Sequence, residues 1–406
     1  MTFTQKNNLR AITIYTLRSV VLLASTGALM QTFLAIVGFD TRQLYLHSTF
    51  LQTANVLTIM LCAKWADKGN LMRRSASVLL PSALLYLFYL PFCFSSGVGS
   101  LSFVYLLIIS IFHAVTQALI SVCEYKLPYY IYERNGYGPI LAVCGITASL
   151  ASFFAGLLMS SLSAYFSYER LMLFSFILAC LLLLIASLLQ LSQKVHPRSE
   201  AMLQSEEHSQ EEKKEFSVLK TLTHPLFYRL LPANLFRGLA NGLTTVLAVA
   251  AIDIGYKEAV TTALVSAQSL AMLLSCALFG IISKRISPRL PILAGSLLFA
   301  VLPLMLLKND FLLLFVCFLV FFGRTLIDYG VPVVLIRAVP VGMAGPYNAW
   351  RIILHNGGTL IATALASVLP VGTLIFLTVI LQLISGFLFF FSSALRKVSP
   401  LLTKSL

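Results

Sequence analysis

Long uninterrupted runs of apolar residues constrain this chain more than any other feature of its sequence. Each run spans about 20 residues, the length that an α-helix needs to cross a bilayer. Twelve such runs can be distinguished, at 12–37, 44–62, 76–95, 101–124, 139–162, 169–192, 227–252, 260–282, 290–307, 311–335, 346–369 and 372–394. The sequence therefore predicts an all-α membrane protein with twelve transmembrane helices.

The charged residues are few and unevenly distributed. They make up 11% of the chain, and the net charge is +14. If the N-terminus is cytoplasmic, four basic residues fall in outer loops (Arg42, Arg170, Lys257 and Lys308) and four within helices (Arg18, Arg237, Arg324 and Arg351). All other Lys and Arg residues then fall on the cytoplasmic side, as the positive-inside rule requires. We therefore expect a multi-pass protein of the plasma membrane with both termini cytoplasmic, and no binding of nucleic acid.

One extended polar segment interrupts the apolar pattern between the sixth and seventh runs. Residues 194–225 contain six glutamates together with Lys213 and Lys214. A segment of this composition cannot bury itself, and it is typical of a solvated linker. It divides the chain into an N-terminal six-helix bundle at 1–193 and a C-terminal six-helix bundle at 226–406. We expect the two bundles to be pseudo-symmetric.

The two halves carry matching motifs in the same order, as a duplicated protein would. Glu124-Tyr125-Lys126-Leu127-Pro128 recurs as Asp328-Tyr329-Gly330-Val331-Pro332, with the acid late in an apolar run each time. The further matches are Arg18 with Arg237, Gly38-Phe39 with Gly255-Tyr256, Gln52 with Gln268, and Gly138-Pro139 with Gly345-Pro346. Internal repeats with polar groups in the membrane are typical of secondary transporters.

The loops after the second and eighth runs carry a further pattern. Ala63-Lys64-Trp65-Ala66-Asp67-Lys68-Gly69-Asn70 precedes Arg73-Arg74, and Gly280-Ile281-Ile282-Ser283-Lys284-Arg285 occupies the matching place. With the six-plus-six repeat and the central linker, this pattern resembles the major facilitator superfamily, whose signature loop reads Gly-x-x-x-Asp-Arg/Lys-x-Gly-Arg-Arg/Lys. The first copy has Ala for Gly, and the second lacks the acid. The resemblance implies a gating loop that holds the halves together on the cytoplasmic side, formed by Asp67, Lys68, Arg73, Arg74, Lys284 and Arg285; a tight turn with solvated charges is the alternative.

Polar residues inside the runs fall on helical stripes, because residues three, four, seven or eleven positions apart share one face of a helix. We take them as candidates for substrate binding and proton coupling. They are Arg18 in the first run; Gln52 and Asn55 in the second; His113, Gln117 and Glu124 in the fourth; Asn234, Arg237 and Asn241 in the seventh; Gln268 in the eighth; Arg324 and Asp328 in the tenth; and Arg351 and His355 in the eleventh.

An arginine and an acid lie at comparable depth in each half. In the family that the chain resembles, helices 1, 4, 7 and 10 line the central cavity, which implies that Arg18 faces Glu124 and Arg237 faces Asp328. Pairing offsets part of the cost of burying each charge. Two interpretations stay open: structural ion pairs that position helices, and pairs that break when substrate or a proton arrives. His113 is likewise either a packing residue or a group that titrates near neutrality, as is His355.

These patterns favour a secondary active transporter that moves a small solute by alternating access, coupled to protons. The alternatives are an efflux antiporter for drugs or amphipaths, and an organic-anion exchanger in which Arg18 and Arg237 bind the anion, as guanidinium groups do. The middle of the fifth run lacks the Gly-Pro that many drug exporters of the family carry, which disfavours the antiporter. A polytopic membrane enzyme or a receptor is the alternative from a different class.

The sequence lacks the H-E-x-x-H, G-x-S-x-G and P-loop patterns, so we expect no enzyme. The seven cysteines lie in or beside apolar runs without a C-x-x-C pair, so we expect no disulfide, metal site or cofactor. The expected partners are the lipid bilayer, a small-molecule substrate and protons, and the protein is expected to be a monomer.

Overall fold

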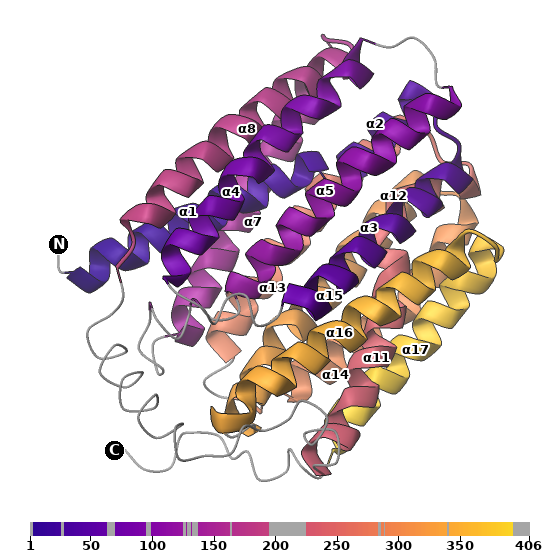
Figure 1. Cartoon of the computed structure of the whole chain (residues 1–406). Helices are drawn as coiled ribbons and strands as arrows, with labels where there is room; N and C mark the ends of the chain where they lie inside the picture. The colour runs from indigo at the N-terminus through magenta and orange to yellow at the C-terminus, as the bar shows by residue number, and fades with distance from the viewer. Residues whose placement is uncertain are drawn as a thin grey trace.

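The computed structural model describes residues 3–25, 28–62, 70–94, 99–124, 127, 131, 137–162, 165–194, 225–282, 286–287, 289–338 and 341–392. Every regular element within these residues is a helix. Figure 1 shows the helices running side by side along one direction, with the indigo and magenta helices of the N-terminal half next to the orange and yellow ones of the C-terminal half. The expected all-α class is thus confirmed.

The helices follow the apolar runs closely. In the N-terminal half they are α1 (Phe3–Ser25), α2 (Ala28–Val37), α3 (Thr41–Cys62), α4 (Leu71–Leu85), the 3₁₀ helix η2 (Tyr86–Cys93), α5 (Ser100–Glu124), α7 (Tyr137–Leu162) and α8 (Tyr168–Ser192). In the C-terminal half they are α11 (Pro225–Thr245), α12 (Leu247–Ile254), α13 (Glu258–Ile282), α14 (Arg289–Leu298), the 3₁₀ helix η3 (Phe299–Leu307), α15 (Asp310–Ala338), α16 (Val341–Ala366) and α17 (Val371–Phe391).

Each of the twelve runs contains helix, but not every helix meets a strict test for crossing a membrane. Within the described residues, 8 helices are long and apolar enough, or up to 9 if α11 and α12 form one broken span. The chain is therefore a multi-pass membrane protein, and twelve crossings stay a prediction. The remaining runs fall short because polar stripes lower their hydropathy or because a break shortens them.

A break divides the first run of the C-terminal half. The run at 227–252 bends by 55° between α11 and α12. In the run at 12–37, residues 26 and 27 between α1 and α2 lie outside the described residues. Around Thr244 and Thr245 the cause is local, because both hydroxyls donate to the Asn241 carbonyl oxygen, at 2.8 and 2.9 Å, in competition with the helix ladder. Gln31 of α2 donates to the Thr245 carbonyl oxygen at 2.8 Å, so the N-terminal half caps this break.

The turns after α2 and α12 have the same geometry. Gly38 and Gly255 take φ values of 112° and 105°, where a side chain would be strained. Phe39 N donates to the Leu34 carbonyl oxygen and Tyr256 N to the Ala251 carbonyl oxygen, each at 3.0 Å, which completes a Schellman cap. The sequence match between these glycine-aromatic pairs is therefore also a structural match.

The aromatic residue of each turn contacts the 3₁₀ segment of its own half. The Phe39 ring lies 5.8 Å from the ring of Phe92 in η2, and the Tyr256 hydroxyl donates to the Met305 carbonyl oxygen of η3 at 2.7 Å. Each 3₁₀ segment contains a proline, Pro91 or Pro303, which cannot donate to the helix ladder. The internal repeat therefore includes the glycine turns and the 3₁₀ segments as well as the α-helices.

The halves meet most extensively at α7 with α13 and at α3 with α16, and α2 also packs against α12 and α13 (Figure 1). Small residues allow close approach at the first pair: a Cβ on Gly145 would lie 2.8 Å from the Cys276 sulfur, and one on Gly156 would lie 3.1 Å from Ser266 Oγ. At the second pair, Asn356 Nδ2 donates to Asn55 Oδ1 at 2.9 Å. Both contact surfaces thus combine small and polar groups, as is common between membrane helices.

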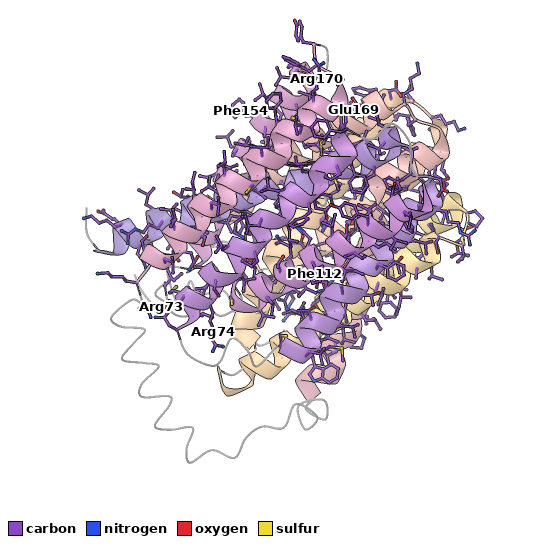
Figure 2. All side chains as sticks on the ribbon, turned by 45° about the horizontal axis from the view of Figure 1, so that its top comes forward. Arg73, Arg74, Phe112, Phe154, Glu169 and Arg170 are labelled. Carbon is purple, nitrogen blue, oxygen red and sulfur yellow. The ribbon has the colours of Figure 1, made fainter. Side chains whose placement is uncertain are left out.

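The periphery and the ends of the helices differ in chemistry. Phe112 and Phe154 are exposed aromatic side chains on α5 and α7, as lipid-facing positions would be. Figure 2 shows Arg73 and Arg74 at one end of the molecule and Glu169 and Arg170 at the opposite end. The charged groups outside the core thus lie where the helices begin and end.

Candidate functional site

Arg18 and Glu124 form an ion pair in the N-terminal half. Arg18 lies on α1 and Glu124 ends α5, and Arg18 Nη1 contacts Glu124 Oε1. The arginine side chain is 11% exposed and the carboxylate 36%. Arg18 and Glu124, which the family resemblance implies should face one another, are therefore in contact in the structure.

Asp328 of α15 meets two arginines in the C-terminal half. Arg237 of α11 donates from Nη2 to Asp328 Oδ1. Arg324 lies one turn before Asp328 on the same helix, with its Nε 3.6 Å from Asp328 Oδ2. The side chains of Arg324 and Asp328 are 27% and 40% exposed. Neither charge is therefore fully buried by the protein around it.

A chain of polar contacts extends from the second ion pair across three helices. Arg324 Nη1 donates to Thr244 Oγ1 at 3.2 Å, and Thr244 Oγ1 donates to Asn241 Oδ1 at 2.8 Å. The Asn241 amide nitrogen lies 3.4 Å from His355 Nε2 on α16. Arg237, Arg324 and Arg351 are all within electrostatic range of the His355 ring. This network therefore joins most of the polar candidates of the C-terminal half.

Close packing of α11 against α16 holds this network in place. A Cβ on Gly358 would lie 2.6 Å from the Leu235 carbonyl oxygen, and one on Gly242 would clash with Ala362. The Thr359 hydroxyl donates to the Gly238 carbonyl oxygen at 3.0 Å. The glycines are thus needed for the approach that brings His355 to Asn241.

His113 occupies a buried polar cluster in the N-terminal half. Its Nε2 lies 3.5 Å from the Tyr86 hydroxyl and 3.4 Å from the Gln117 amide nitrogen, which donates to Ser82 Oγ at 3.2 Å. The Tyr86 and His113 rings pack edge to face, with their centroids 4.9 Å apart. This environment fits a packing role, and a role in proton transfer stays a prediction.

The remaining candidates lie outside these networks. Asn234 is buried, and its Nδ2 donates to the Leu230 carbonyl oxygen of its own helix at 3.0 Å. Gln52 and Gln268 are half-buried on α3 and α13. Asn55 instead forms the contact with Asn356 that joins the two halves. The candidate residues thus comprise those in the ion pairs and polar networks, the buried Asn234, Asn55 at the contact between the halves, and the half-buried Gln52 and Gln268.

Most of the expected gating residues cannot be placed, because Asp67, Lys68, Lys284 and Arg285 lie outside the described residues. Arg73 and Arg74 lie in the first turn of α4. Asn70 caps this helix by accepting hydrogen bonds from the backbone N–H groups of Met72 and Arg73, at 3.0 and 3.2 Å. The gating role of the loop stays a prediction.

Several polar contacts were missed by the sequence reasoning. His47 Nε2 lies 2.7 Å from Ser110 Oγ in the N-terminal half. Tyr329 of α15 reaches across to Gly145 of α7 and interacts with the Tyr15 hydroxyl. Asn356 could have been recognised as a polar residue inside an apolar run. The other contacts depend on which helices are neighbours, which a single sequence does not show.

The helical fold and the paired charges inside it define a multi-pass membrane protein of the transporter class. The chain belongs to the Major Facilitator Superfamily, because the model of that family matches residues 12–363. This match confirms the resemblance that the loop and repeat patterns indicated. Comparison with curated proteins gives no match.

Solved structures support the same fold. A crystal structure of a bacterial homologue of the iron transporter ferroportin, in the outward-facing state with soaked iron, is similar to this chain with a TM-score of 0.62. The similarity covers 96% of this chain and 98% of the other, at 14% sequence identity. At this identity the likeness concerns the fold alone.

Proposed function

We propose that the protein is a secondary active transporter that moves a small solute by alternating access. Two bundles, at 1–193 and 226–406, would rock against each other about a site near mid-membrane, with the linker at 194–225 joining them. The observation that carries the proposal is the pair of equivalent ion pairs, Arg18–Glu124 and Arg237–Asp328. An ion pair with a purely structural role gains no stability when its carboxylate is exposed. A transport site, in contrast, must be exposed so that its ligand can reach it.

The contacts between the halves suit such a movement. Small residues line the α7–α13 contact, and a single amide hydrogen bond, Asn55 with Asn356, spans the α3–α16 contact. The bend between α11 and α12 is capped from the other half by Gln31. Broken helices of this kind often surround the sites of transporters. The halves can therefore separate at either end without breaking a large network of hydrogen bonds.

Proton coupling follows from the same carboxylates. A protonated Asp328 would no longer neutralise Arg237 and Arg324, so proton uptake would free two arginines for new partners. Glu124 would release only Arg18. We therefore propose that Asp328 carries the coupling and that Glu124 positions α1 against α5.

We further propose that the transporter is a monomer in the plasma membrane with both termini cytoplasmic. The support is the charge asymmetry of the loops, with Arg73 and Arg74 at the cytoplasmic end and Glu169 at the outer end (Figure 2). Within the described residues, no group of three His, Cys, Asp or Glu side chains could hold a metal ion. We do not extend the iron of the structural neighbour to this chain.

Transport in proteoliposomes tests the proposal. A thermal-shift screen with sugars, phosphates, peptides and lipophilic cations first supplies a solute, because a ligand of the folded state raises its stability. Asp328→Asn should then keep solute exchange but lose accumulation driven by a pH gradient, and Glu124→Gln should keep both. Glu169→Gln, which changes an acid at the outer end of α8, is the control. Full pH-driven accumulation in both Asp328→Asn and Glu124→Gln would make the acids structural.

A further inference from the structure

The two ion pairs differ in their balance of charge. Glu124 is paired with Arg18, whereas Asp328 is shared by Arg237 and Arg324. Guanidinium groups stay protonated in proteins, so this second site holds one more positive than negative charge among its described groups. Uncompensated charge inside a membrane is costly and marks sites of function.

We propose that the C-terminal half binds an oxyanion, a carboxylate or phosphate group of the transported solute, between Arg237 and Arg324. The inference rests on the proposed transport function and adds the chemical class of its substrate. It differs from a site shared between Arg18 and Arg237, because Glu124 already neutralises Arg18. All the ligating groups would come from α11, α15 and α16.

The two arginines have donor atoms for the anion, one of them buried without a partner among the described residues. Arg237 is 8% exposed, and its Nη1 has no hydrogen-bond partner within the residues that the structure describes. Arg324 is held by Thr244 and Asp328 at one side while 27% of its side chain stays exposed. A guanidinium group binds oxyanions through two parallel N–H donors. Arg237 would thus bind the anion from a buried position, and the partly exposed Arg324 would contact it as it enters.

Neutral donors surround these arginines. The Thr244 hydroxyl and the Asn241 amide lie on the same face of α11, and His355 contacts Asn241 from α16. The Asn241 amide and the His355 ring can donate hydrogen bonds to oxygens of the ligand, whereas the Thr244 hydroxyl already donates to Asn241 and orients it. None of them adds negative charge, so the polar network favours an anion and disfavours a cation.

The Asp328 carboxylate would compete with the ligand anion for Arg237 and Arg324. When its carboxylate takes up a proton, the two arginines lose their negative partner and a ligand oxyanion can replace it. One proton and one anionic group would then enter the site together. Asp328 faces Arg237 on α11, Cys276 on α13 and Arg324 on its own helix. His355 and Arg351 of α16 lie near one another, and His355 is also near Arg237 and Arg324. Of the uncharged groups, His355 is the one whose titration could imitate this behaviour.

Binding measurements on the full chain test the inference. The protein is placed in nanodiscs of neutral phosphatidylcholine, and thermal melts with inorganic phosphate, succinate and glucose are recorded between pH 5.5 and 8. Phosphate or succinate should raise the melting temperature, more strongly at low pH, and glucose should not. Stabilisation by phosphatidylglycerol nanodiscs alone, without any response to the soluble anions, would assign the site to a lipid headgroup and overturn the inference.

Variants separate Asp328 from its neighbours. Asp328→Asn should bind the anion about tenfold more tightly at pH 8 and lose the pH dependence, because the amide cannot neutralise the arginines. Arg324→Gln should weaken binding about tenfold or more, and His355→Gln should keep the pH dependence. Arg170→Gln, an exposed arginine of α8, is the matched control and should bind like the natural protein.

The outcomes also distinguish this inference from the proposed function. Unchanged or weaker binding in Asp328→Asn would refute the competition between carboxylate and ligand, even if Arg324→Gln failed to fold. Transport of a neutral solute with no response to either anion would overturn the anion site and leave the transporter in place. Anion binding without any transport would overturn the transporter function and leave the anion site in place.

Discussion

At the level of single residues, the environment of each arginine determines what its loss would cost. Arg18 is mostly buried against Glu124, which has no second arginine within the ion pairs of the described residues. Asp328 would keep Arg324 if Arg237 were removed. The two halves therefore share a pattern and differ in how much they depend on one contact.

A double-mutant cycle on Arg18 and Glu124 measures this dependence. Arg18→Ala leaves a carboxylate without its partner and should lower stability, and Arg18→Ala/Glu124→Ala should recover part of the loss. We expect a coupling energy on the order of 1–3 kcal/mol, reduced by the partial exposure of the acid. The parallel cycle on Arg237 and Asp328 should give a smaller value. Thermal melts supply both numbers, and additive single effects in both cycles would show that neither pair holds its helices.

At the level of helices, adjacent glycines on α16 have different surroundings. A Cβ on Gly358 would meet the Leu235 carbonyl oxygen and the Leu239 nitrogen of α11, at 2.6 and 2.7 Å. A Cβ on Gly357 would have nothing within 4 Å. Close backbone packing thus requires glycine at only one of the two positions.

The pair gives a matched test of helix packing. Gly358→Ala should force α16 away from α11 and lower the free energy of unfolding by about 1–3 kcal/mol. Gly357→Ala should be neutral or stabilise by up to about 1 kcal/mol, because alanine favours helix. Thermal unfolding of the two variants side by side checks both. An equal loss of stability in the two would mean that α11 and α16 do not pack as described.

At the level of the whole molecule, the repeat relates the two halves through their irregular parts. The glycine turns at Gly38 and Gly255 and the 3₁₀ segments η2 and η3 recur in the same order. Figure 1 shows the helices of each half grouped together, and the two groups meet where α3 contacts α16 and α7 contacts α13. A movement of one half against the other would therefore use both contacts.

Cysteine labelling tests the orientation of the whole chain. Gln210→Cys lies in the polar linker, outside the described residues, and should resist an impermeant thiol reagent applied to intact cells, because the linker is expected to be cytoplasmic. Tyr165→Cys, in the exposed turn before α8, should be labelled. The natural protein, with its seven cysteines, gives the background. Strong labelling of Gln210→Cys from outside would reverse the proposed topology.

The sequence by itself determined the features that depend on local pattern. Apolar runs of membrane length predict helices wherever they occur, and helical spacing places His113 with Gln117 and Arg324 with Asp328 on common faces. The repeat places an arginine and an acid at matched depth in each half, and the family resemblance then implied that the two would face one another. The family follows from the same signals, since its loop and repeat are patterns of sequence.

Only the tertiary structure decided which faces meet. The rotation and tilt of each helix depend on packing with its neighbours, so the contacts of Thr244 with Arg324, of Asn55 with Asn356 and of Tyr329 with Gly145 could not be predicted from spacing. The division of the run at 227–252 into α11 and α12 was hidden because the sequence has no proline or glycine at the break around Val246. The second arginine at Asp328 was visible as a helical neighbour, but the shared carboxylate required Arg237 to approach from another helix, which is a property of the folded chain.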